Sequence, residues 1–252
     1  MRTLGRLTWI EMKLFVRDPL AVIFTFAFPI FMLVVLAGVF GNEIDASDPE
    51  DFEAWRGVGP IDYYAPAYVG LVMASVGLIV LPLRLAGYRE RGVLRRFQAA
   101  GLPLEAVIGS QVLLGLALAV VGAVAISVGA RVGYGAALPE SWPGVAAAFA
   151  VGLVCFLLLG IALGAVLPTA RSAQGAGIIL FFVMMMLGGA GPPRGVLTGP
   201  MLLLSDVLPL THVVLTLQGP WLGDGWDGAA SGAAAAFSAA SAVVALRFFR
   251  WQ

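Results

Sequence analysis

The stretch DYYAPAYVGLVMASVGLIVLPLR, residues 62–84, indicates how this chain folds. Residues 63–83 lie between Asp62 and Arg84 and contain no charged side chain. A helix of that length extends about 31 Å at a rise of roughly 1.5 Å per residue, which matches a hydrocarbon core about 30 Å thick. An ionised side chain at the bilayer centre costs about 2.5–3.5 kcal/mol, so charges are expected only at the ends. The stretch therefore predicts a helix that crosses a membrane.

The rest of the chain repeats this pattern. Of its 252 residues, 60 % are hydrophobic and 12 % charged, and the mean hydropathy is +0.94. Too little polar surface is available to cover a soluble globule of this size. Apolar windows bounded by charges predict six transmembrane helices, at about residues 20–40, 63–83, 106–130, 143–167, 173–191 and 228–246. The expected fold is an all-α membrane protein, with residues 1–252 in a single transmembrane domain.

The basic residues are distributed unevenly among the loops between these windows. With six spans both chain ends share one side, and that side holds twelve of the fifteen basic residues: Arg2, Arg6, Lys13, Arg17, Arg84, Arg89, Arg91, Arg95, Arg96, Arg171, Arg247 and Arg250. The other side keeps only Arg56, Arg131 and Arg194. Because cytoplasmic loops of membrane proteins carry an excess of Lys and Arg, both termini are expected to be cytoplasmic.

Residues 1–19, before the first span, have an amphipathic pattern. On a helix, the basic residues at positions 2, 6, 13 and 17 gather within roughly 60° of one another. Four apolar residues fall on the opposite side: Leu4, Leu7, Leu14 and Phe15. The segment predicts a helix in the cytoplasmic membrane interface, in which Arg6, Lys13 and Arg17 face the headgroups. Glu11 interrupts the apolar face, either as a paired or snorkelling acid or as a contact to another helix or subunit.

The loop at residues 85–104, after the second span, contains the charged stretch YRERGVLRRFQAAGLP, residues 88–103. Apolar residues recur at i, i+4 and i+7 in this loop, and a polar set recurs on the opposing face. The apolar set is Val93, Phe97 and Ala100, and the polar set is Arg91, Arg95 and Gln98. Gly101 and Pro103 end the helix. The arginines alone fit a positive-inside anchor, but the apolar set and Glu90 favour a cytoplasmic helix that docks a partner.

Two further regions lie outside the six windows. Residues 195–223 hold two apolar runs separated by Asp206 and interrupted by three prolines, which predicts a re-entrant segment on the external side. Residues 41–62 carry seven acidic side chains and one arginine, as expected of a solvated external loop.

Catalytic and metal-binding patterns are not found in the sequence. The P-loop motif requires a lysine after glycine, and the only lysine, Lys13, lies in WIEMKLF. With one cysteine and one histidine, no metal site is expected, and Cys155 is expected to pack as a small hydrophobe. His212 is interpreted as a hydrogen-bonded interfacial residue in preference to a proton relay.

Small residues and methionines offer packing surfaces in the later spans. Gly160 and Gly164 form one GxxxG pattern, and Gly228 and Gly232 form another, so both permit close helix approach within one subunit or between two and are candidates for subunit packing. Residues 184–186 are three consecutive methionines, which fit either the core or an adaptable surface for an apolar substrate.

Taken in order, these features resemble the permease subunits of type-2 ABC exporters. The resemblance rests on VRDP at residues 16–19, FAFPIF around Pro29, the loop RERGVLRRFQAAGLP and LPLTHVVLTLQG at residues 208–219. In that family the loop commonly reads E-R-x-x-G-T-L-x-R-L-x-x-x-P. Val93 stands where threonine is common, and His212 stands where tyrosine is common.

The resemblance implies a permease of the inner (cytoplasmic) membrane that exports drugs, antibiotics, lipids or other amphiphiles. A separate ATPase subunit would bind ATP and Mg²⁺, and this chain would bind no cofactor. The ATPase would take Val93, Leu94 and Phe97 into a cleft, with Glu90, Arg91 and Arg95 at its rim. A second permease, identical or different, would complete the pathway, and no nucleic acid is involved. The alternatives are a non-transporting scaffold and, less favoured, an intramembrane enzyme.

Overall fold

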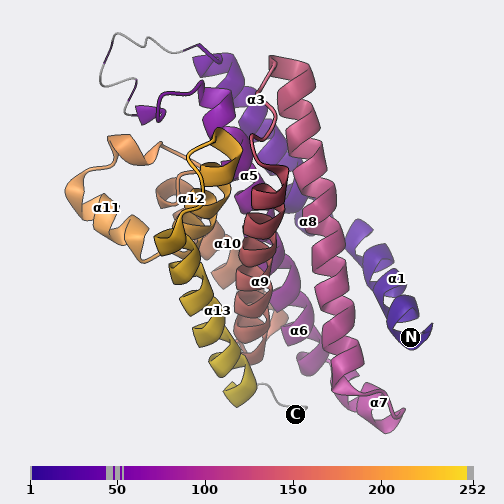
Figure 1. The fold of residues 1–252 in the computed structure, drawn as a ribbon. Coiled ribbons are helices and arrows are strands. Elements are labelled where there is room, and N and C mark those ends of the chain that lie inside the picture. The colour runs from indigo at the N-terminus through magenta and orange to yellow at the C-terminus, as the bar shows by residue number, and fades with distance from the viewer. Residues whose placement is uncertain (1, 44–47, 49–51, 53, 249–252) are drawn as a thin grey trace.

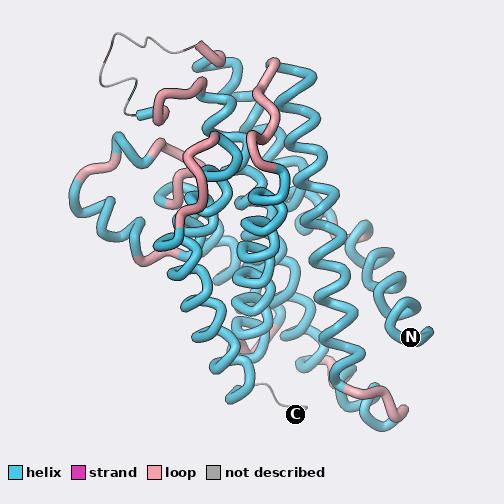
Figure 2. The backbone as a smooth tube through the Cα atoms, viewed as in Figure 1, coloured by secondary structure: helices cyan, strands magenta, loops and turns pink. Residues whose placement is uncertain are grey.

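The structure, a computed structural model, describes residues 2–43, 48, 52 and 54–248. These residues form helices joined by loops, and no strand occurs among them (Figure 1, Figure 2). Six helical segments are long and apolar enough to cross a membrane: Pro19–Phe40, Pro60–Glu90, Glu105–Tyr134, Trp142–Val166, Ala170–Leu187 and Gly228–Phe248. The predicted all-α fold with six transmembrane helices is confirmed. Of the acids predicted in the external loop, Asp45, Glu50, Asp51 and Glu53 lie outside the described residues, as does Arg250.

The elements follow the chain in a simple order. They are α1 (Arg2–Val16), α2 (Pro19–Val22), η1 (Ile23–Ala27), α3 (Phe28–Phe40), α5 (Pro60–Ser75), η2 (Val76–Val80), α6 (Leu81–Glu90), α7 (Val93–Ala99), α8 (Leu104–Tyr134), α9 (Trp142–Val166), α10 (Ala170–Leu187), η3 (Arg194–Val196), α11 (Gly199–Asp206), α12 (Pro209–Leu222) and α13 (Gly228–Phe248). The start of α1, the end of α13 and α7 lie at one end of the bundle, which we call the terminal end (Figure 1).

The second span, which consists of α5, η2 and α6, is the core of the molecule. In its most apolar window 94 % of the residues are buried, whereas the other five spans reach 50 % at most. Helices α3, α8, α9, α10 and α12 all pack against it. The stretch that predicts a membrane helix is therefore the segment around which the other helices assemble.

Glycines allow the neighbouring helices to approach the middle of the second span closely. A Cβ atom at Gly77 would lie 2.3 Å from the carbonyl oxygen of Phe156 in α9, and one at Gly177 of α10 would lie 2.0 Å from that of Leu78. Real Cβ atoms do not approach other atoms this closely, so only glycine fits at these positions. The contacts enclose η2, a π-helical turn, between α9 and α10.

The same packing selects between the two roles predicted for Gly160 and Gly164. A Cβ atom at Gly160 would lie 2.5 Å from the carbonyl oxygen of Gly77, and one at Gly164 would lie 2.8 Å from Cβ of Leu85. Both glycines therefore face the second span of their own chain and are not available to another subunit. Gly228 and Gly232 have no neighbour within 4 Å of an added Cβ, and a role for them between subunits stays a prediction.

Helix boundaries follow the predicted windows except beside two arginines. The second span continues to Glu90, past the predicted end at residue 83, so the predicted loop at 85–104 begins inside a helix. Its first charge, Arg84, is paired within the protein and does not end the helix. Helix α8 extends to Tyr134 because Arg131, in its last turn, donates to the carbonyl oxygens of Gly135 and Ala136.

The segment before the last span is bent. Helices α11 and α12 meet at an angle of 85°, and both lie in the half of the molecule opposite the terminal end (Figure 1). Thr211 donates to the Ser205 carbonyl oxygen at 2.7 Å, which ties the two sides of the bend together. Nε2 of His212 donates to the Asp206 carbonyl oxygen at 2.8 Å. This geometry agrees with the predicted re-entrant segment and with a hydrogen-bonded His212.

Candidate functional site

At the terminal end of the bundle, the last turns of α6 contact four other elements. We call the group formed by Glu11, Arg84, Tyr88, Arg89 and Glu90 the α6 junction. Four of these residues are on α6, and Glu11 is on α1. Their side chains join α6 to α1, to α7 and to the turn between α9 and α10.

The contact to α1 is a buried ion pair. Nη1 of Arg84 lies 2.5 Å from Oε2 of Glu11 and also donates to the Glu11 carbonyl oxygen at 3.0 Å. The hydroxyl of Tyr88 donates to Oε1 of Glu11 at 2.5 Å. Glu11, Arg84 and Tyr88 are 4 %, 9 % and 8 % exposed, so water screens these charges little. The acid that interrupts the apolar face of residues 1–19 is thus both paired and in contact with another helix.

Two basic residues of α1, Arg6 and Lys13, are exposed, and so is Arg17 just after its end. Phe15 is buried in the core. Leu14, predicted on the apolar face with Phe15, is 44 % exposed. A position in the membrane interface stays a prediction for this helix.

The contact to α7 is apolar. The rings of Tyr88 and Phe97 lie 6.3 Å apart in an edge-to-face arrangement. Leu94 is 1 % exposed and packs in one cluster with Tyr88 and Val107, and Val93 and Phe97 cover this cluster. Leu94 therefore fills a site in its own chain and cannot enter a cleft of a partner, while Val93 and Phe97 remain partly exposed.

The opposite side of α7 is basic and exposed. Arg95, Arg96 and Gln98 of this helix are exposed, as is Arg91 in the turn before it. None of these arginines takes part in an ion pair within the described part of the chain. Gly92 at φ 64° separates α7 from α6, and Gly101 at φ 72° follows its end, as the sequence predicts for Gly101. The short helix is thus held on one side and open on the other.

Arg89 and Glu90 bind the turn between α9 and α10. Nη1 of Arg89 donates to the Ala165 carbonyl oxygen at 2.6 Å, and its Nη2 donates to that of Leu167. The Ala170 amide donates to Oε2 of Glu90 at 2.8 Å. A cation therefore lies at the C-terminus of α9 and an anion at the N-terminus of α10, which is the favourable sense for both helix dipoles. Glu90, predicted at the rim of a partner's cleft, has its carboxylate bound within this chain.

Three residues of the junction are absent from the site residues that the sequence predicts: Arg84, Tyr88 and Arg89. Arg84 and Tyr88 are four residues apart, so the sequence alone could have shown that they share a helix face. Their partner Glu11 lies more than seventy residues away, and the pattern of one sequence cannot join the two.

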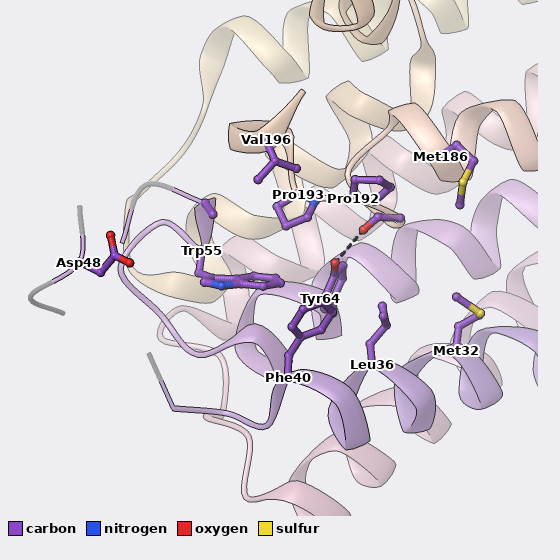
Figure 3. A pocket seen from close by; sticks show the side chains of 12 residues that line it. Met32, Leu36, Phe40, Asp48, Trp55, Tyr64, Met186, Pro192, Pro193 and Val196 are labelled. Atoms are coloured by element: carbon purple, nitrogen blue, oxygen red, sulfur yellow. Dashed lines mark hydrogen bonds between the residues drawn. The ribbon is translucent and has the colours of Figure 1, made fainter. Parts of the chain in front are cut away.

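A cavity of about 720 Å³ lies in the other half of the molecule (Figure 3). Its walls come from α3, from α5, from the end of α10 and from the loops beside them, and they include Met32, Leu36, Phe40, Trp55, Tyr64, Met186, Pro192 and Pro193. The hydroxyl of Tyr64 donates to the Gly191 carbonyl oxygen at 2.7 Å, which holds the ring in the wall of the cavity (Figure 3). Met184 and Met185 are buried in the core, and only Met186 of the three methionines faces the cavity.

Polar side chains close the end of the bundle beside this cavity. Nη2 of Arg56 lies 2.6 Å from Oδ2 of Asp224, and its Nη1 donates to Oε1 of Gln218 at 3.0 Å. Arg194 pairs with Asp206 at 2.8 Å. Among the residues that the structure describes, no three His, Cys, Asp or Glu side chains gather as a metal site.

These features define a multi-pass membrane protein with a charged helix junction at one end and an apolar cavity near the other. The chain belongs to the ABC-2 type transporter family, which matches residues 2–219. It is thus a membrane-spanning permease of the ABC transporter class, as the motifs of the sequence predict. Curated proteins give no match to it.

Proposed function

We propose that this chain is the permease subunit of an ATP-driven exporter and that a separate ATPase subunit binds the exposed basic face of α7. Membership of the ABC-2 type transporter family supports this proposal. ATP and Mg²⁺ belong to the ATPase, since the only lysine of this chain is not in a phosphate-binding loop. The terminal end, which holds α7, then faces the cytoplasm, and the membrane is the inner (cytoplasmic) membrane.

The observation that carries the proposal is the α6 junction. A force on α7 reaches the second span through Tyr88 and Leu94, and it reaches α1 through Glu11. It reaches α9 and α10 through Arg89 and Glu90. Because these contacts converge on the helix around which the others pack, a displacement of α7 would move the membrane domain as a body.

The cavity near the other end supports an apolar or amphiphilic substrate. Apart from Asp48, the side chains in its walls are aromatic, aliphatic and thioether groups, which bind apolar groups without fixed hydrogen-bond geometry. Drugs, antibiotics and lipids belong to this chemical class. A second permease, identical or different, would face the exposed apolar sides of α3 and α10, where Phe31 and Ile179 are 60 % and 65 % exposed.

Docking on α7 is tested with the pair Arg95→Glu and Arg96→Glu in one chain. Both side chains are exposed, so the variant is expected to fold and insert normally. The tagged protein is purified in mild detergent from membranes of its native host, and bound ATPase and ATP hydrolysis are measured. We expect loss of the bound ATPase, because two repulsive charges replace two attractive ones in the contact.

The matched control is Arg247→Glu, which changes an exposed arginine in α13 at the same end. It should retain the ATPase. Equal recovery of the ATPase with the α7 variant and with the control would disprove docking on this face. A scaffold would bind an ATPase without moving substrate, so uptake of a fluorescent lipid analogue into proteoliposomes on addition of ATP separates the two functions.

A further inference from the structure

A second cavity, of about 380 Å³, opens between α8 and α9 in the half of the molecule that carries the first cavity. Its sides are formed by Ala123, Val124, Ser127, Val128, Arg131 and Val132 of α8 and by Trp142, Val145 and Phe149 of α9. Val69 of the second span and Trp221 of α12 form its floor. We call this cavity the α8–α9 groove. Its volume falls within the range of roughly 300–1,000 Å³ that is usual for small-molecule sites.

The groove is mostly apolar and continuous with an exposed apolar surface of α8. Val124, Val128 and Val132 are 56 %, 54 % and 80 % exposed and form one stripe along this helix. The Ser127 hydroxyl donates to the Ala123 carbonyl oxygen of its own helix at 2.7 Å, so it presents no free donor to the groove. At the floor Val69 and Trp221 are only 2 % and 5 % exposed. These walls fit an apolar occupant such as a hydrocarbon chain.

The rim of the groove carries the groups that are typical of the headgroup region. Trp142 begins α9 and is 61 % exposed, as is usual for tryptophan at a membrane interface. Arg131 lies in the last turn of α8. Its Nη1 donates to the Gly135 and Ala136 carbonyl oxygens, and these hydrogen bonds hold the guanidinium at the rim. Its Nη2 and Nε make no hydrogen bond to any part of the chain that the structure describes.

The acids near this rim are turned to other partners. Oδ1 of Asp62 accepts from the Ala137 amide at 2.7 Å, and its Oδ2 accepts from the side chain of Asn42. Glu140 lies against Gly223 and lines a different cavity, formed with Ser141 and Trp226. Arg131 is therefore the charged side chain that lines the groove, and its charge favours an anion.

We propose that the α8–α9 groove binds an anionic phospholipid, with one acyl chain between α8 and α9 and the headgroup phosphate on Arg131. The chain covers Trp221 and Val69, and the phosphate accepts from the nitrogens of Arg131 that have no partner. Hydrogen bonds between charged groups are about twice as strong as neutral ones, so the charge selects the headgroup while the groove selects the chain. This inference concerns lipid and does not depend on the proposed function.

The headgroup is tested by native mass spectrometry of the full-length protein in detergent, with phosphatidylglycerol and phosphatidylcholine of identical chains. Wild type should retain phosphatidylglycerol about tenfold better, the ratio expected of one charge-assisted contact. Arg131→Gln should reduce that ratio to near one. Arg247→Gln, which removes an exposed charge from the last turn of α13 at the other end, should leave it unchanged.

The acyl chain is tested by quenching of tryptophan fluorescence with phosphatidylglycerol that carries brominated chains. The part of the quenching that disappears in Trp221→Phe reports on the floor of the groove. Ser127→Phe fills the groove and should abolish this part. Val121→Phe adds the same ring on the same helix at a 57 % exposed position that does not line the groove, and it should have no effect.

The proposal requires both the preference of wild type for phosphatidylglycerol and the loss of Trp221 quenching in Ser127→Phe. Equal retention of the two lipids by wild type, or Trp221 quenching that survives Ser127→Phe, overturns the proposal. Release of the lipid by inorganic phosphate alone would indicate a site for free anions and would equally overturn it. The oligomeric state of each variant is compared with wild type by size-exclusion chromatography, so that a folding defect is not taken for a loss of lipid.

Discussion

At the scale of single residues, the buried ion pair of Glu11 and Arg84 places the strictest requirement on residue identity. Both side chains are almost fully buried, and their charges are stable there only because each compensates the other. Tyr88 satisfies the second carboxylate oxygen of Glu11. The pair fixes where α1 meets the second span, which hydrophobic contacts alone would leave less defined.

Breaking the pair should destabilise the protein more than removing it. Glu11→Gln leaves Arg84 buried without a countercharge, and we expect a loss of about 3–5 kcal/mol in the free energy of unfolding. The double variant Glu11→Leu with Arg84→Met should regain most of that loss, because no unpaired charge remains. Unfolding in mixed micelles, followed by circular dichroism, measures both.

The exposed Arg6 on the same helix provides the control, and Arg6→Gln should change the free energy of unfolding by less than about 0.5 kcal/mol. A double variant as unstable as Glu11→Gln alone would show that the pair itself contributes net stability. If the double variant is stable but its transport is impaired, the pair serves coupling.

Gly77 is the second residue whose identity the packing dictates. Gly77→Ala places a Cβ atom 2.3 Å from the Phe156 carbonyl oxygen, so α9 must move. We expect a loss of about 1–3 kcal/mol in the free energy of unfolding, the usual cost of overpacking. Gly232→Ala meets no atom within 4 Å and should be neutral or stabilise α13 by up to about 1 kcal/mol. Equal stability of the two variants would contradict this packing.

At the scale of elements, α7 differs from the other helices because one face is anchored and the other is free. The anchor is Leu94, which is buried against Tyr88 and Val107. The free face is basic. A helix of seven residues is not stable by itself in water, so its conformation depends on this anchor.

Leu94→Ala should therefore release α7 without unfolding the spans. The cavity left by a buried leucine costs about 2–5 kcal/mol, and the loss should fall on α7 because few other contacts hold it. Hydrogen exchange of residues 93–99 should accelerate, while exchange in α5 and α9 stays slow. Gln98→Ala, on the exposed face, should leave the exchange unchanged. Acceleration throughout the bundle would mean that α7 is part of the core.

The sequence predicts most elements because charge and apolar length determine them. Five of the six windows agree with their helices to within about four residues at each end. The prediction is wrong beside Arg84, where a partner distant in the chain neutralises the charge. It does not identify what covers Leu94 and Gly160, because a periodic pattern shows that a face is buried but not which surface covers it. Such partners are a property of the tertiary fold.

At the scale of the whole molecule, the structure divides into two ends with different chemistry. The end with α1, α7 and the last turn of α13 is rich in arginine and holds the α6 junction (Figure 1). The other end holds the two apolar cavities and the bent pair of α11 and α12. The second span connects the two ends as one continuous helix from Pro60 to Glu90. It contacts α7 at one end and lines both cavities near the other, so a movement of α7 can reach the cavities through this helix.

The orientation of these two ends is the prediction that the proposed mechanism needs most. In a background of Cys155→Ser, we expect Gln98→Cys in α7 to react with a membrane-impermeant maleimide only after the cells are opened. Leu138→Cys, 54 % exposed in the loop between α8 and α9, should react in intact cells. The physical reason is the excess of arginine at the α7 end, since moving charged loops across the membrane is unfavourable. Both positions are exposed, so accessibility differs only through the membrane. Labelling of residue 98 from outside would place α7 away from any cytoplasmic ATPase, and the basic face would then need another partner.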